Sequence, residues 1–253
     1  MERNLNQFFT SKLTGKKVLI SGGTTGIGRE IALWLCAIGA DVLICGRTQQ
    51  PLDETINEAN SLNYPGKCMG MQADIAVQED IDKIISEVGS QLGGLDILIN
   101  NAGLAHGSIT EGKYEDWVYI MNTNLVGCLA LSHHAITRMK EKGSGHIVNI
   151  GSMSAQSKNP ESSVYVATKS GMRGFTESLR KEVNEMGIKV TLIEPGAVDT
   201  DMQEASKEEK LEKVRKLEML TSSDIAITTL FCLLQPERSD IIALQIRPHL
   251  QIS

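Results

Sequence analysis

Two side chains suited to proton transfer, Tyr165 and Lys169, lie four residues apart. The surrounding sequence is typical of a helix, and residues four apart in a helix lie on one face, about one turn from each other. An ammonium group at that distance favours the phenolate form of a tyrosine, which makes the hydroxyl a better proton donor and acceptor. The pair therefore predicts an acid/base centre, although the same spacing also occurs on exposed helices.

A hydroxyl and an amide accompany this pair. Ser152 directly follows an apolar run that should be a strand, and Asn124 lies in a long stretch that should be the preceding helix. Two fixed hydroxyl donors can stabilise negative charge that develops on a substrate oxygen. The four residues together favour an enzyme over an exposed helix pair.

A glycine-rich turn lies between the first apolar run and the first helical pattern of the chain. At this position a pyrophosphate can approach the unpaired N–H groups of a helix start with little steric obstruction. A tight strand-to-helix connection has the same composition, so the turn alone is weak evidence for a nucleotide site. The candidate residues in this turn are Gly22, Gly23, Thr24, Thr25, Gly26, Ile27 and Gly28.

The end of the second expected strand indicates which dinucleotide would bind. An acidic residue there would bind the adenosine ribose hydroxyls and repel a 2′-phosphate, but the sequence has Gly46 followed by Arg47. The planar guanidinium suits a phosphate. We therefore expect NADP(H) to be preferred, with NAD(H) as the alternative cofactor and a solvated loop charge as the alternative interpretation of Arg47.

Short apolar runs alternate with helical patterns along the chain. This rhythm predicts a parallel sheet, because each helical crossover must pack back over the sheet. We expect an α/β fold with a single doubly wound, Rossmann-like domain over residues 1–253, a parallel sheet of about seven strands, and helices on both faces. The expected strands are 17–21, 41–45, 67–72, 95–99, 146–150, 189–193 and 241–246, the expected helices include 26–38, 51–62, 78–92, a long one to about 141, and 161–186, and residues 1–14 form a polar leader.

Composition excludes several classes of protein. The chain has 253 residues, 41% of them hydrophobic, and a net charge of −6, as expected of a packed globular domain. Scattered basic residues argue against a nucleic acid partner, and no apolar stretch reaches the roughly 18 residues of a membrane helix. Five widely spaced cysteines fit neither a disulfide framework nor a metal site, so we expect no metal and a cytoplasmic location.

The glycine turn, together with Asn100-Asn101-Ala102-Gly103 after the fourth expected strand, resembles the short-chain dehydrogenase/reductase family, whose members bind NAD(H) or NADP(H). Asn124, Ser152, Tyr165 and Lys169 match the family's catalytic tetrad position by position. The resemblance implies that Tyr165 exchanges a proton with the carbonyl or alcohol oxygen while Ser152 hydrogen-bonds that oxygen. It also implies that Lys169 binds the nicotinamide ribose and that Asn124 holds a water linking Lys169 to solvent.

Further cofactor contacts follow from the same resemblance. It assigns one pair of residues to the adenine end, one turn to the wall beside the adenosine ribose, and the segment after the sixth strand to the nicotinamide amide. Residues 200–220 fall where the family carries its substrate lid. The implied contact residues are Asp74 and Ile75, then Asn101, Ala102 and Gly103, then Pro195, Gly196, Val198 and Thr200, besides the glycine turn, Arg47, Tyr165 and Lys169.

The tail from Ile241 to Ser253, together with 222–226 and 235–238, is similar to NADP-dependent reductases and dehydrogenases that act on 3-hydroxy acids, serine-like compounds and small aldehydes. Separately, Glu194 stands where many relatives in the wider family have asparagine. We therefore expect an NADP(H)-dependent oxidoreductase that interconverts an aldehyde, ketone or keto acid with its alcohol. The resemblance also implies a homo-oligomer, a tetramer or a dimer. A dinucleotide-binding sensor or scaffold without turnover is the alternative, which the complete tetrad disfavours.

Overall fold

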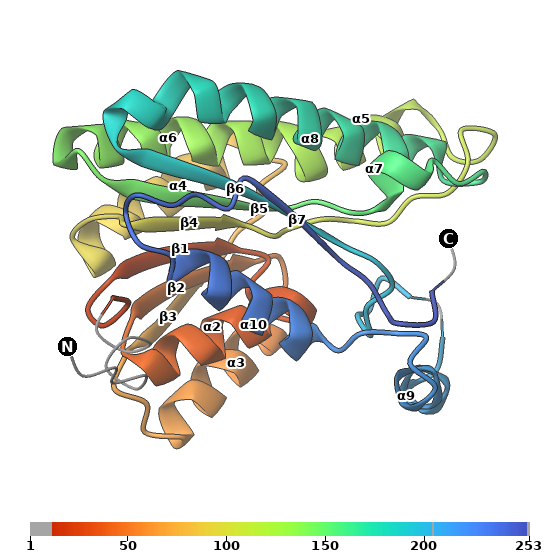
Figure 1. Cartoon of the computed structure of the whole chain (residues 1–253), viewed down its shortest axis with the longest axis horizontal. Coiled ribbons are helices and arrows are strands. Elements are labelled where there is room, and N and C mark those ends of the chain that lie inside the picture. Colours follow the sequence, from red (N-terminus) through yellow and green to blue (C-terminus); the bar gives the residue numbers. More distant parts are fainter. Residues whose placement is uncertain (1–11, 204, 252–253) are drawn as a thin grey trace.

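The structure, a computed structural model, describes residues 12–203 and 205–251. Within these residues, seven parallel strands form one sheet in the order β3-β2-β1-β4-β5-β6-β7 (Figure 1). The chain builds one half of the sheet outward from β1, then returns to place β4 on the other side of β1. The strands are β1 (Lys17–Ser21), β2 (Asp41–Gly46), β3 (Cys68–Gln72), β4 (Ile97–Asn100), β5 (Gly145–Ile150), β6 (Ile188–Pro195) and β7 (Ala243–Ile246).

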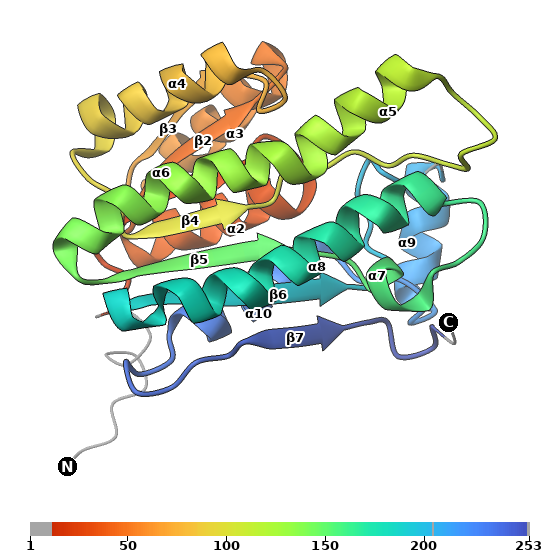
Figure 2. The same ribbon diagram turned by 90° about the horizontal axis from the view of Figure 1, so that it is seen from above.

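Helices cover both faces of this sheet (Figures 1 and 2). One face carries α2 (Gly26–Ile38), α3 (Gln49–Ser61) and α10 (Ser222–Leu233), and the other carries α4 (Gln78–Glu87), α5 (Tyr114–Met121), α6 (Gly127–Lys142) and α8 (Ser163–Val183). The doubly wound α/β fold expected from the sequence is therefore confirmed. The remaining α-helices, α7 (Ser154–Ser157) and α9 (Lys207–Arg215), lie near the carboxyl ends of the strands, and a short 3-10 helix, Asn184–Met186, follows α8.

The strands are apolar because both of their faces are buried. In β1, Val18 and Ile20 pack with Ile31 of α2, whereas Leu19 packs on the opposite face with Leu131 of α6. Successive strand residues point to opposite faces, so one short apolar run contributes to both cores. Leu13, within the expected polar leader, is buried in the first of these cores, and residues 1–11 of that leader lie outside the described residues.

Two expected helices are interrupted. The stretch 78–92 forms α4 and then a π-helical turn, Val88–Leu92, and the long stretch before β5 is divided into α5, a π-helical turn at Asn122–Val126, and α6. Periodicity of apolar residues does not distinguish an α-helical turn from a π-helical one, because the extra residue shifts the pattern only locally. Among the described residues, no helix combines the length and apolar character that crossing a bilayer demands.

Candidate functional site

A cavity of about 770 Å³ lies at the carboxyl ends of the strands, on both sides of the junction between β1 and β4. Strand order reverses there, and the loops on either side leave a crevice that commonly binds a ligand. Arg47 follows β2 and Ser152 follows β5, so three strand spacings, or about 14 Å, separate the two ends of the site. All the sequence-predicted site residues line the cavity except Gly23, Gly28 and Asn124.

The glycine turn brings the start of α2 to the cavity. Gly22 and Gly26 have positive φ angles of 64° and 52°, which glycine adopts without strain. A Cβ on Gly28 would lie 2.1 Å from the carbonyl oxygen of Gly22, so this position admits no side chain. The side chain of Thr25 forms no capping hydrogen bond at the helix start, which leaves the first N–H groups of α2 available to an anion.

The turn after β4 is tied to the glycine turn. The side-chain amide of Asn101 donates to the carbonyl oxygens of Gly22 at 2.8 Å and Ser21 at 3.2 Å. The hydroxyl oxygen of Ser21 accepts from the backbone N–H groups of Asn101 and Ala102, each at 3.2 Å. These bonds cross between neighbouring strands, so they fix the wall of the cavity relative to its glycine-rich floor.

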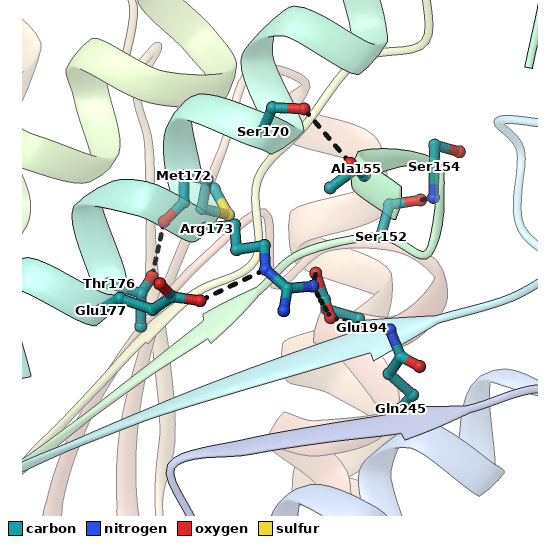
Figure 3. Close-up of polar contacts among 10 residues, drawn as sticks. All are labelled: Ser152, Ser154, Ala155, Ser170, Met172, Arg173, Thr176, Glu177, Glu194 and Gln245. Carbon is teal, nitrogen blue, oxygen red and sulfur yellow. Dashed lines mark hydrogen bonds and ion pairs between the residues drawn. The ribbon is translucent and has the colours of Figure 1, made fainter. Parts of the chain in front are cut away.

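Three residues of the expected catalytic set converge on the cavity. Tyr165 and Lys169 project from one face of α8, with the ammonium 5.7 Å from the centre of the tyrosine ring. Lys169 is buried and donates to the carbonyl oxygen of Ile150 at 2.9 Å, at the end of β5. Ser152 lies just beyond that strand end, and its hydroxyl oxygen accepts from the N–H of Ser154 at 3.1 Å (Figure 3).

Asn124 lies outside the cavity wall, in the π-helical turn between α5 and α6. Its side-chain oxygen accepts from the N–H of Leu104 at 2.7 Å, and its nitrogen donates to the carbonyl oxygen of Leu104 at 2.9 Å. The same nitrogen donates to the hydroxyl of Thr168 at 3.2 Å. The buried amide therefore fastens the segment after β4 to α8.

Comparison with known proteins agrees with this geometry. The model of the short chain dehydrogenase family matches residues 16–211. The chain belongs to this family. Membership makes it an oxidoreductase that acts with NAD(P). A Staphylococcus epidermidis protein described as an uncharacterized oxidoreductase is 34% identical over 239 residues, which cover 94% of this chain and 99% of the relative.

Solved structures of family members have the same fold. A short chain dehydrogenase from Burkholderia cenocepacia in complex with NADP is 30% identical, with a TM-score of 0.82, and the match covers 94% of this chain and 98% of that one. An actinorhodin polyketide ketoreductase with NADPH is 29% identical, with a TM-score of 0.83 and the same coverage of 94% and 98%. The sequence-based assignment to this oxidoreductase family is confirmed.

One contact beside this cavity was not expected from the sequence. At the Arg47 end, Arg47 Nη1 donates to the Tyr119 hydroxyl at 2.8 Å, and that hydroxyl donates to Asp74 Oδ2 at 2.6 Å. Burial and the hydrogen bond to Asp74 raise the pKa of Tyr119. Tyr119 is on α5, 72 residues from Arg47, so no local spacing points to this contact.

An ion pair between Arg173 of α8 and the buried carboxylate of Glu194 in β6 lies near Ser152 (Figure 3). Both carboxylate oxygens of Glu194 accept from Arg173 Nη1, at 3.2 and 3.0 Å, and Oε2 also accepts from Gln245 Nε2 at 3.1 Å. A Cβ on Gly151 would lie 3.2 Å from the Glu194 side chain, so the pair supports the backbone just before Ser152. The sequence alone does not indicate this pair, because Arg173 and Glu194 are 21 residues apart and lie on different elements.

Proposed function

We propose that this short-chain dehydrogenase is an NADP(H)-dependent oxidoreductase that interconverts an aldehyde, ketone or keto acid with its alcohol. The observation that carries the proposal is the convergence of Ser152, Tyr165 and Lys169 in the cavity that also receives the start of α2. A hydroxyl donor, a tyrosine and an ammonium group beside an anion-binding helix start match hydride transfer to a carbonyl.

The residues of the cavity fit a dinucleotide phosphate. Gly22 and Gly26 line the cavity beside the helix start without a side chain, and Arg47 lies at the opposite end from Ser152, where a 2′-phosphate would bind. The NADP and NADPH bound to the Burkholderia dehydrogenase and the actinorhodin ketoreductase support the same cofactor here. When bound, the cofactor supplies the hydride.

Tyr165 and Ser152 act on the substrate oxygen. We assign the proton that this oxygen gains or loses to the Tyr165 hydroxyl. The Ser152 oxygen already accepts from Ser154 N–H, which leaves its own hydrogen to donate into the cavity. Two donors at one oxygen stabilise the charge that develops on it during reduction.

Lys169 acts on both the cofactor and Tyr165. Its ammonium has three N–H donors and uses one of them on the carbonyl oxygen of Ile150. The others remain for the nicotinamide ribose, and the positive charge stabilises the phenolate of Tyr165 after proton transfer. Lys169 Nζ and Asn124 Oδ1 both flank Gly103, 3.6 and 3.7 Å from the place of its absent Cβ, which supports a proton relay on that side of the site.

The test is oxidation of NADPH, followed by absorbance at 340 nm, with a panel of aldehydes, ketones and keto acids. The Tyr165→Phe variant keeps the aromatic ring but loses the proton donor, so we expect turnover to fall at least a thousandfold while the affinity for NADPH changes little. Tight NADPH binding without turnover of any carbonyl by the unaltered protein would instead favour the sensor or scaffold.

We also propose a cytoplasmic homo-oligomer, a tetramer or a dimer. Large apolar side chains on α10 and before β7 support assembly, because Ile227, Phe231 and Ile242 are each more than half exposed. Light scattering of the purified protein would give the mass in solution. A monomer at micromolar concentration would contradict this part of the proposal.

A further inference from the structure

The adenine end of the cavity places two opposite charges on neighbouring strand ends. Arg47 follows β2 and Asp74 follows β3, and adjacent parallel strands are about 4.8 Å apart. Side chains at that separation are long enough to form a direct ion pair. Such a pair would occupy the guanidinium and hold a carboxylate beside it, and both effects oppose binding of a 2′-phosphate.

The Tyr119 hydroxyl lies between these charges. It accepts a hydrogen bond from Arg47 Nη1 at 2.8 Å and donates one to Asp74 Oδ2 at 2.6 Å. Asp74 is held on its other oxygen by the N–H of Ala76 at 2.9 Å. The phenol therefore satisfies both charged groups and separates them by one hydroxyl.

Arg47 keeps N–H donors that can bind an anion. A guanidinium has five N–H donors, and the contact with Tyr119 uses one of them. The tyrosine ring lies beside the cation, 5.9 Å from the guanidinium carbon to the ring centre, and Gln72 donates to the backbone carbonyl of Arg47 at 2.8 Å. Tyr119 thus orients the guanidinium of Arg47, and Gln72 orients its backbone.

We propose that Tyr119 is a specificity-determining residue for the cofactor, because its hydroxyl keeps Arg47 from pairing with Asp74 and presents the guanidinium to the 2′-phosphate of NADP(H). This inference rests on the proposed NADP(H) function. Burial and the bond to Asp74 raise the pKa of Tyr119, so the hydroxyl keeps the proton that it donates to Asp74 at neutral pH.

The decisive variant is Tyr119→Phe, which keeps the ring and the helix but removes the hydroxyl. Fluorescence titration of the full chain should show a five- to tenfold rise in the Kd for NADPH and less than a twofold change for NADH, which has no 2′-phosphate. The kcat at saturating NADPH should stay within twofold. Tyr114→Phe is the matched control, because it removes the same group from a ring of α5 that is 70% exposed.

A second substitution tests the mechanism. Asp74→Asn removes the charge that would capture Arg47, so in this background Tyr119→Phe should lower the NADPH affinity less than twofold relative to the Asp74→Asn single variant. An undiminished effect of Tyr119→Phe in that background would overturn the separating role, and so would equal losses for NADPH and NADH or no loss at all. A wild-type chain without NADPH preference would refute both proposals, whereas a preference that Tyr119→Phe leaves intact would refute only this one.

Discussion

Arg173 and Glu194 offer the sharpest test of what supports the Ser152 end of the cavity. The carboxylate of Glu194 is 1% exposed, whereas the Arg173 side chain is 31% exposed. Removing the arginine in Arg173→Met leaves a buried charge without its cation, a change that costs about 3–5 kcal/mol. Gln245 still donates to this carboxylate at 3.1 Å, so we expect the lower part of that range, about 3 kcal/mol.

Replacing the other partner of the pair should lower the free energy of unfolding by less. Glu194→Gln leaves a guanidinium that water partly reaches and that still donates to Glu177 at 3.3 Å, so we expect a loss of about 1–2 kcal/mol. The double variant Arg173→Met with Glu194→Met removes both charges and should recover much of the loss, because well-packed apolar residues often replace a buried ion pair without cost.

Urea unfolding of the three variants and the parent, followed by circular dichroism, measures these free energies. We expect Arg173→Met to be less stable than Glu194→Gln, because the carboxylate is more deeply buried than the guanidinium. A loss below about 1 kcal/mol for Arg173→Met, or a larger loss for Glu194→Gln than for Arg173→Met, would show that the pair is not the buried support that its geometry indicates.

Two further predictions concern a buried histidine and the glycine turn. Burial lowers the pKa of His146 from 6.5 to about 4, so the unfolded chain binds more protons between these values. The free energy of unfolding should therefore decrease as pH falls, by about 2 kcal/mol from pH 7 to pH 5. Urea titrations at the two pH values measure this decrease, and the His146→Gln variant, which lacks the titrating group, should not show it. Gly28→Ala places a Cβ 2.1 Å from the oxygen of Gly22, so NADPH affinity should fall at least tenfold in a fluorescence titration, and parent-like binding would contradict the role of the turn.

The sequence by itself determined the alternation of strands and helices. Apolar runs such as Val18 to Ile20 serve both faces of a buried sheet, and a pattern set by neighbouring residues is visible without the fold. Element ends were less accurate: the strand expected at 95–99 begins at Ile97, and the helix expected over 161–186 begins at Ser163. Hydrogen bonds between distant segments set these ends, and the periodicity of apolar residues does not reveal such bonds.

Motifs whose residues are close together in the sequence also indicated the central part of the site. Tyr165 and Lys169 share a helix face by their separation alone, and the glycine turn occupies the strand-to-helix junction where a phosphate fits. Each motif lies within one unit of local structure. The strand order then places these units side by side at the β1/β4 junction.

Only the tertiary structure decided which distant groups meet. Tyr119 reaches Arg47 across 72 residues, and Glu194 meets Gln245 across 51, because α5 crosses beside the β2 end and β7 pairs with β6. Asn124, in the π-helical turn between α5 and α6, binds Leu104, which lies 20 residues earlier in the segment after β4. Periodicity fixes the face on which a residue lies, whereas the partner on that face depends on how separate elements pack, and this is why the supporting contacts of the site emerged only from the folded chain.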